Sequence, residues 1–340
     1  MEKKLFLLDA YALIYRAHFA FINNPRINSK GLNTSAIFGF CNSLLEVINN
    51  HKPTHLGVVF DPPGGSNREE VFSEYKANRQ EMPEDIRNSI PYIFDILNSM
   101  NIPTEMVSGY EADDLIGTLS KQAEKQGYKV FMMTPDKDFG QLVSENIFIY
   151  KPGRSGNPSE ILGVKEVCEK FEVERPEQVI DILGLWGDAV DNIPGIPGIG
   201  EKTAKKLIGI YGSIENLLAN TQDLKGKQKE NVENFADQGL ISKQLATIIL
   251  DCPVEFNASQ YERKKINEDS LIKILKELEF NQLGKRILGK PIFQEKQMDL
   301  FAINEVENTT STDFQSFSSK NTNYQLIKSK EEHESFVLSL

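Results

Sequence analysis

Short apolar runs alternate with helical periodicity through the first half of this chain. The runs are continuous, as is typical of strands buried on both faces, and they predict strands at residues 4–9, 56–61, 102–106 and 129–135. Between them, apolar residues recur at the spacing of amphipathic helices, as in residues 36–50 and 113–127. This alternation predicts an α/β fold, with a parallel sheet covered by helices on both faces.

The pattern changes at three points further along the chain. We expect an α/β core over residues 1–178 and a helical subdomain over residues 179–290. Residues 291–323 are rich in Ser, Thr, Asn and Gln, which predicts a flexible linker. Residues 324–340 have the pattern of one strand and the beginning of one helix. We therefore expect a further domain to begin there, with a short tail that packs on the helical subdomain as the alternative.

Composition excludes several classes of protein. The 340 residues are 40% hydrophobic and 26% charged, an ordinary globular mixture. No apolar run approaches the roughly 20 residues of a membrane span, and no signal peptide begins the chain, so we expect a cytoplasmic protein without membrane contact. Three cysteines without a CxxC pair and four scattered histidines argue against disulfides and zinc.

Nine carboxylates occur in five clusters, four of which closely follow apolar runs. They are Asp9, Asp61, Glu111, Asp113, Asp114, Asp136, Asp138, Asp188 and Asp191. Ligands bind beyond the carboxyl ends of parallel strands, so we expect these side chains to converge there. Two like charges about 4 Å apart repel by roughly 4 kcal/mol at an effective dielectric of about 20, so the array needs protons or cations.

Carboxylate oxygens suit Mg²⁺ or Mn²⁺, and two such ions most often serve phosphodiester hydrolysis. Each acid also has an ordinary interpretation, because an Asp after a strand is often a helix N-cap or a turn former, and acids favour the start of a helix. Five clusters at consistent positions favour the metal site. Asp188 and Asp191, three residues apart at an expected helix end, should project from one face. The net charge of −11 lowers the expectation of DNA binding, but bound cations would neutralise much of it.

The segment NIPGIPGIGEKTAKKL, residues 192–207, predicts a hairpin between two helices that grips a DNA phosphate. Its glycines and the following helix start present backbone N–H groups to an anion, with lysines alongside. The expected contacts are Gly195, Gly198, Ile199, Gly200, Lys202, Thr203, Lys205 and Lys206. The alternative is a plain corner between helices with solvated lysines.

A basic and aromatic stretch follows the second apolar run. Residues 66–79 would place five such side chains along one helical face: Arg68, Phe72, Tyr75, Lys76 and Arg79. The cations could stabilise charge on a scissile phosphate and the aromatic rings could stack on bases. Three glutamates balance the cations, so a solvated amphipathic helix is the alternative. Arg16, seven residues after Asp9, would contact a substrate phosphate or pair with a carboxylate.

The motifs DAYALIYR, VVFD followed by YKANR, GYEADD, TPDKD and GDAVDNIPGIPGIGEKTA resemble, in this order, the 5′-nuclease domain of bacterial DNA polymerases I, within the flap endonuclease family. The resemblance covers about residues 1 to 290. It implies a PIN-like or resolvase-like core with a helix-hairpin-helix (H3TH) subdomain. It also implies a 5′→3′ exonuclease and flap endonuclease with two Mg²⁺ or Mn²⁺ ions, acting on flapped, nicked or gapped DNA and on RNA primer ends. Such an enzyme is expected to be a monomer in the bacterial cytoplasm, near the nucleoid.

The resemblance also implies roles for single residues. Ligands of one metal would be Asp9, Asp61, Glu111 and Asp113, and ligands of the other Asp136, Asp138, Asp188 and Asp191, with Asp114 bound to a metal or directly behind a ligand. Substrate-handling positions would be Tyr15, Arg16, Arg68, Lys76 and Arg79, with Arg16, Arg68 and Lys76 acting in catalysis. The segment 62–90 would form an arch over the 5′ end. The hairpin would clamp the duplex and hold a K⁺ ion.

The end of the chain carries two further expectations. Residues 324–340 look like the start of a proofreading-type domain of a parent polymerase, with a free-standing 5′ nuclease as the alternative. The peptide QMDLF resembles a motif that docks in the bacterial sliding clamp, through Gln297, Met298, Leu300 and Phe301. An apolar anchor that folds back on its own domain is the alternative. Two rival functions are an RNA nuclease and a non-catalytic module that binds flapped DNA.

Overall fold

A computed structural model describes residues 2–153 and 158–293 of the chain. These residues belong to one compact unit, Met1–Gln294. Most of the expected linker, the expected tail, and the residues Gln297, Met298, Leu300 and Phe301 lie outside the described residues. In the part that is described, no helix has both the length and the apolar character needed to cross a membrane.

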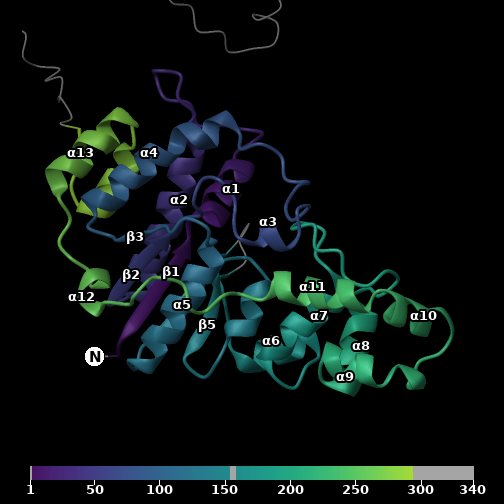
Figure 1. The fold of residues 1–340 in the computed structure, drawn as a ribbon. Coiled ribbons are helices and arrows are strands. Elements are labelled where there is room, and N and C mark those ends of the chain that lie inside the picture. Colours follow the sequence, from purple (N-terminus) through teal and green to yellow (C-terminus); the bar gives the residue numbers. More distant parts are fainter. Residues whose placement is uncertain (1, 154–157, 294–340) are drawn as a thin grey trace, which may run out of the picture. The chain divides into compact units, whose positions relative to one another are not determined.

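The core is a sheet with strand order β3-β2-β1-β4-β5-β6 (Figure 1). The strands are β1 (Lys4–Asp9), β2 (His55–Val59), β3 (Thr104–Glu105), β4 (Lys129–Met133), β5 (Ile147–Lys151) and β6 (Glu160–Leu162). All neighbours pair in parallel except β6, which is antiparallel to β5. The predicted parallel sheet is confirmed, whereas β5 and β6 were not predicted.

Alternate residues of the buried strands face two different helical layers. Leu5 and Leu7 of β1 pack in one hydrophobic cluster with α5 (Ala112–Lys125), and Phe6 and Leu8 pack in a second cluster on the other face. The helices of the second layer are α1 (Ala10–Ala20), α2 (Ser35–Glu46) and α4 (Glu84–Ser99). A π-helix, η1 (Val47–His51), extends α2. The strands therefore read as continuous apolar runs because both faces are covered.

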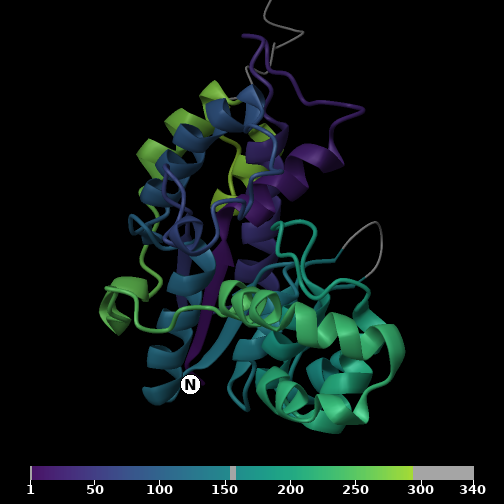
Figure 2. The same ribbon diagram turned by 45° about the vertical axis from the view of Figure 1, so that its right-hand side comes forward.

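Five helices that follow the sheet gather in one group, shown in green tones in Figures 1 and 2. They are α7 (Val179–Trp186), α8 (Glu201–Tyr211), α9 (Ile214–Ala219), α10 (Gly226–Asn234) and α11 (Ala236–Ala246). Three shorter elements precede this group along the chain: η2 (Asp138–Leu142) follows β4, and α6 (Val164–Phe171) and η3 (Pro176–Gln178) lie between β6 and α7. A fourth, η4 (Thr221–Asp223), connects α9 and α10. The helical pattern predicted from Val179 onward is present here.

The last helices leave that group and return to the α/β core, unlike the expected helical subdomain over residues 179–290. They are α12 (Ala258–Tyr261), α13 (Glu268–Glu277) and α14 (Asn281–Leu288). Leu271 and Leu275 of α13 are fully buried in the same cluster as Ile93 and Ile96 of α4. An amphipathic pattern shows that a helix buries one face, but it does not show which core receives that face.

The stretch expected as one helix over residues 66–79 is mostly turns. Only α3 (Arg68–Val71) is helical. Lys76 has a left-handed backbone with φ of 57°, and its N–H donates to the Asp191 carbonyl at 2.9 Å. The Asn192 side chain donates to the Glu74 carbonyl at 2.6 Å. These contacts with a distant loop replace the helical hydrogen bonds that the local sequence favours.

Candidate active site

Six of the nine predicted carboxylates line two adjoining cavities at the carboxyl edge of the sheet. Asp9 ends β1, and Asp61 and Asp136 follow β2 and β4. One cavity, of about 430 Å³, is lined by Asp9, Asp61, Asp113 and Asp136 among others. The other, of about 290 Å³, is lined by Asp9, Asp136, Asp188 and Asp191 among others. The two cavities share Asp9 and Asp136, so the structure brings these acids together as strand ends predict.

The carboxylates do not close around a single point. Within residues 2–153 and 158–293, no three acidic, histidine or cysteine side chains are arranged to hold a metal ion. Backbone donors occupy some of the oxygens: Ala12 N–H donates to Asp9 at 3.1 Å, and Ala112 N–H donates to Asp61 at 2.8 Å. Thr134, which the sequence analysis did not single out, also donates to Asp9 at 3.1 Å. The expected single cage is therefore not formed by the side chains as they stand.

Burial and mutual repulsion change the pKa values of these acids. The pKa of Asp9 rises to about 7 because the group is buried and because Asp61 and Asp136 lie near it. Burial, then the charges of Asp136 and Asp9, raises the pKa of Asp113 well above its ordinary value. Burial also raises the pKa of Asp138, and one of its oxygens has no hydrogen-bond partner among the described residues. The array therefore favours bound protons wherever cations do not replace them.

Three basic side chains of the chain itself supply part of the missing positive charge. Lys76 donates to Glu111 at 2.6 Å, Arg79 to Asp191 at 2.6 Å, and Lys137 to Asp188 at 2.6 Å. Lys137 stands between the two acids of the TPDKD motif and was not singled out from the sequence. Burial alone would raise the pKa of Glu111, but Lys76 and Arg68 lower it below its ordinary value. Glu111 is thus held as a carboxylate.

Arg68 and Asp114 form a buried pair and do not line either cavity. Arg68 is 7% exposed and Asp114 is 0% exposed. Two guanidinium nitrogens donate to the two Asp114 oxygens at 2.8 and 2.7 Å. Arg68 therefore does not face substrate as expected, because the two groups already satisfy each other inside the protein. Asp114 was expected to bind a metal or to lie directly behind a ligand, and it takes the second place, accepting from the N–H of Glu111.

Some of the aromatic and basic side chains that were expected to contact substrate are buried or already bonded within the protein, and others line the larger cavity. Tyr75 is buried, and its hydroxyl donates to Glu111 at 3.2 Å, so its ring is not available to stack on bases. Tyr15 lines the larger cavity, together with Tyr11 and Phe19. Arg16 donates to the carbonyls of Pro152, at 3.2 Å, and Gly153.

Asp188 and Asp191 lie in a turn beyond the end of α7. The helix ends at Trp186, Gly187 has φ of 81°, and Asp188 pairs with Ile193 in an isolated bridge. The two acids therefore do not project from a helical face as expected. The turn nevertheless brings both side chains to the smaller cavity.

The predicted hairpin follows directly from this turn. Gly195 and Gly198 have φ of 60° and 79°, and Gly200 is the N-cap of α8. The side chains of Lys202 and Lys206 are exposed, and Thr203 is half-buried. Lys205 pairs with Glu201 at 2.8 Å. Ile199 is buried, so only its backbone can face a ligand.

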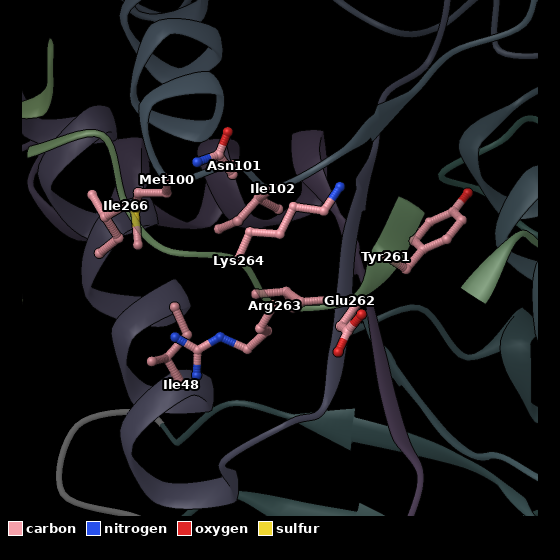
Figure 3. A pocket seen from close by; sticks show the side chains of 10 residues that line it. Ile48, Met100, Asn101, Ile102, Tyr261, Glu262, Arg263, Lys264 and Ile266 are labelled. Carbon is pink, nitrogen blue, oxygen red and sulfur yellow. The ribbon is translucent and has the colours of Figure 1, made fainter. Parts of the chain in front are cut away.

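A cavity between the α/β core and the segment that follows α12 is too small to act as a binding site. It has a volume of about 10 Å³, room for at most one water molecule. Figure 3 shows its lining, with Arg263 reaching from the segment after α12 toward Ile48 of η1. The acidic cavities are therefore the stronger candidates for chemistry.

Comparison with known proteins agrees with this fold and with the motifs. Residues 4–172 match a family model described as the N-terminal resolvase-like domain of 5′-3′ exonucleases, and residues 174–269 match the C-terminal SAM fold of the same enzymes. A 5′-3′ exonuclease from Aquifex aeolicus is 37% identical over 303 residues, which are 88% of this chain and 100% of that protein. The chain belongs to the 5′-3′ exonuclease family. This nuclease is thus a phosphodiester hydrolase by descent, as its motifs predict.

One further relative and one solved structure extend the comparison. DNA polymerase I from Bacillus subtilis is 40% identical over 305 residues, which are 89% of this chain but 34% of that protein. The chain therefore spans about a third of that polymerase. A flap endonuclease of bacteriophage T5, solved with DNA and metal ions, has a TM-score of 0.61 at 21% identity over 83% of this chain and 100% of that one. This last likeness concerns the fold.

Proposed function

We propose that this nuclease hydrolyses phosphodiester bonds of DNA near a 5′ end, at flaps, nicks and gaps, by a two-metal mechanism. The observation that carries the proposal is the pair of adjoining acidic cavities with Asp9 and Asp136 in common. Two neighbouring acidic sites with shared carboxylates suit two ions at the short separation that such enzymes use, about 3.5–4 Å.

The six carboxylates that line the two cavities are the donor type that divalent ions with oxygen ligands prefer, and binding would draw together side chains that now stand apart. Asp61 and Asp113 would hold one ion, Asp188 and Asp191 would hold the other, and Asp9 and Asp136 line both cavities. Glu111 and Asp138 line neither cavity, but their charges act on Asp61 and on Asp136 and Asp188, so they would support these ligands from behind. Mg²⁺ or Mn²⁺ suits this donor set. Bound there, the ions would activate water and stabilise the leaving oxygen. Their charge would also release Lys76, Arg79 and Lys137 from their present carboxylate partners.

The protein's own side chains then have defined tasks. Lys76 and Arg79 line the larger cavity and would bind the phosphate that flanks the cleaved bond. Tyr15 and Phe19, on another wall of that cavity, would support the bases of the unpaired end. Arg16 lies on α1 together with Tyr15 and Phe19 and would guide the sugar-phosphate backbone of the DNA. None of these contacts reads a base edge, so we infer recognition of DNA shape rather than sequence.

The hairpin would hold the duplex part of the substrate. Gly198 and Gly200 are exposed at the start of α8, where backbone N–H groups and the helix dipole favour a phosphate. Lys202 and Lys206 would add positive charge, and the backbone carbonyls of the hairpin would hold a K⁺ ion. Removal of either lysine should weaken the binding of duplex DNA to the same extent whatever the DNA sequence.

The wider setting of the chain is also a proposal. A monomer in the bacterial cytoplasm would act on primers and repair intermediates, either as part of a DNA polymerase I or as a free-standing nuclease. Docking of residues 297–301 on a sliding clamp would bring it to replication sites. A peptide with that sequence should bind purified clamp, and Leu300→Ala with Phe301→Ala should abolish that binding.

One assay separates the proposed enzyme from its rivals. Magnesium should support cleavage of a labelled 5′-flap duplex near the junction, and a chelator or Asp136→Ala should abolish it. Asp95→Asn, an exposed acid on α4, serves as the control and should cleave normally. Tight binding without cleavage would instead favour a non-catalytic module, and preference for an RNA duplex would favour an RNA nuclease.

A further inference from the structure

Helix α11 holds the hairpin at one place along its length. The Ser242 hydroxyl accepts from the Gly195 N–H at 3.0 Å, and the Gln238 side chain donates to the Gly195 carbonyl at 2.6 Å. Ser242 is fully buried. The conformation of the hairpin therefore depends directly on the position of α11.

The carboxyl end of α11 is tied to the buried Arg68–Asp114 pair. Arg68 donates to the carbonyl of Leu245 at 3.0 Å and to the carbonyl of Thr247 at 2.9 Å. Asp114 accepts from the N–H of Ile249 at 2.8 Å. Figure 1 shows α3, which carries Arg68, beside α11.

The same pair fixes the start of α5, which carries two predicted metal ligands. The second Asp114 oxygen accepts from the N–H of Glu111 at 3.1 Å, and Arg68 also lies 3.6 Å from the Glu111 carboxylate. Asp113 is the neighbour of Asp114 and lines the larger cavity. The pair thus stands between α11 and the residues that present Glu111 and Asp113 to the centre.

We infer that Arg68 and Asp114 are positioning residues that couple the duplex-gripping hairpin, through α11, to the carboxylates at the start of α5. The inference rests on the proposed function. A buried ion pair is seldom more stabilising than apolar residues of the same size, so stability alone is a weak reason for its presence. Its contacts to two backbone segments, residues 245–249 and Glu111, instead define a geometry, as groups behind metal ligands do.

The first test measures Mn²⁺ binding by calorimetry, in the absence of DNA, for wild type, Arg68→Lys and Asp114→Asn. The control is Gln122→Ala, because Gln122 lies further along α5 and makes two hydrogen bonds to the segment after α11, at 2.7 and 3.0 Å, away from the acids. The pair variants should bind Mn²⁺ about 10–100-fold more weakly, as for other groups behind metal ligands. The control should lose thermal stability but keep its Mn²⁺ affinity.

The second test asks whether the coupling reaches the hairpin. Binding of a nicked duplex, measured in chelator, should slow amide hydrogen exchange in residues 111–116 of wild type and of Gln122→Ala. It should not slow this exchange in Arg68→Lys. This variant keeps the positive charge and therefore serves the test even if Asp114→Asn fails to fold. Pair variants with wild-type Mn²⁺ affinity and wild-type exchange would overturn the inference. A wild-type protein that neither binds the duplex nor cleaves it would instead contradict the proposed function.

Discussion

Lys76, Arg79 and Lys137 each contact an acid of the centre at 2.6 Å, and each is a cation that a bound ion would make unnecessary. At the residue scale, the site is therefore a set of carboxylates whose charge is shared between protons, basic side chains and metal ions. Which of the three dominates depends on pH and on the concentration of divalent ions, and this gives two predictions.

Lys76→Ala should destabilise the metal-free protein by about 2 to 3 kcal/mol, since it leaves the buried Glu111 without its closest cation while the pair keeps some exposure to water. Magnesium should restore most of that loss. Urea unfolding with and without Mg²⁺ measures both effects. Lys30→Ala, which removes an exposed pair with Glu277, should change the free energy of unfolding by less than about 1 kcal/mol. A Lys76→Ala protein as stable as wild type in chelator would contradict this account.

The raised pKa of Asp9 predicts how stability depends on pH. A carboxyl whose pKa is about 7 in the folded protein and 3.8 as its ordinary value favours folding when protonated, so its contribution is lost as pH rises toward and through 7. Metal-free protein should therefore lose melting temperature between about pH 5 and pH 8, and Mg²⁺ should restore more at pH 8 than at pH 5. Asp9→Asn should flatten the slope. If the melting temperature of Asp9→Asn depended on pH as steeply as that of wild type, groups other than Asp9 would be responsible.

The positions of the acids at strand ends could be predicted from the sequence, since apolar runs followed by Asp locate the carboxyl edge of a parallel sheet. The partners of those acids could not. Arg68 and Asp114 are 46 residues apart, and nothing in the local pattern indicates that they meet in the interior. The local sequence does not distinguish an arginine that forms a buried ion pair from an arginine that binds a substrate phosphate.

At the scale of elements, the stretch 66–79 and the turn at Asp188 and Asp191 show tertiary contacts overriding local helical preference. Both segments were predicted as parts of helices, and they are instead joined to each other through Lys76, Glu74 and Asn192. Both were nevertheless predicted to reach the site, because their motifs carry the chemistry whatever the backbone does. The hairpin was predictable in more detail, since its glycines are required by the backbone itself.

Gly195→Ala should disrupt the hairpin. Gly195 has φ of 60°, and a Cβ there would lie 2.5 Å from the Gly187 nitrogen. We expect a loss of about 1 to 3 kcal/mol in stability and a clear loss of duplex affinity, measured by thermal unfolding and fluorescence anisotropy. Gly209→Ala in α8 is the control, because a Cβ there meets nothing within 4 Å and Ala favours a helix. Equal behaviour of the two variants would contradict the role given to Gly195.

At the scale of the whole molecule, the chain returns to its first core after building the helical group. Helices α13 and α14 complete the layer of α4, so residues near the end of the described chain stabilise the part that begins it. The sequence predicted these helices but assigned them to the wrong neighbour, since long-range packing leaves no local trace. One compact unit follows from this path.

Leu275→Ala should therefore destabilise the α/β core as well as its own helix. Leu275 is fully buried in the cluster that includes Phe6 and Ile93, so we expect a cost of about 2 to 5 kcal/mol in a single cooperative transition. Guanidinium unfolding followed by fluorescence and by circular dichroism checks this. Ile210→Ala, at an isoleucine that is 63% exposed, should be close to neutral. Separate transitions for the core and the last helices would contradict the shared packing.

The location of divalent ions in a crystal soaked with Mn²⁺ tests the central claim most directly, because the anomalous signal of manganese identifies each ion by itself. The account predicts two anomalous peaks, one against Asp9, Asp61, Asp113 and Asp136, and one against Asp9, Asp136, Asp188 and Asp191. Lys76 and Lys137 should have moved away from their present acidic partners in that structure. Manganese bound elsewhere, with both acidic cavities empty and the lysines still in place, would contradict it.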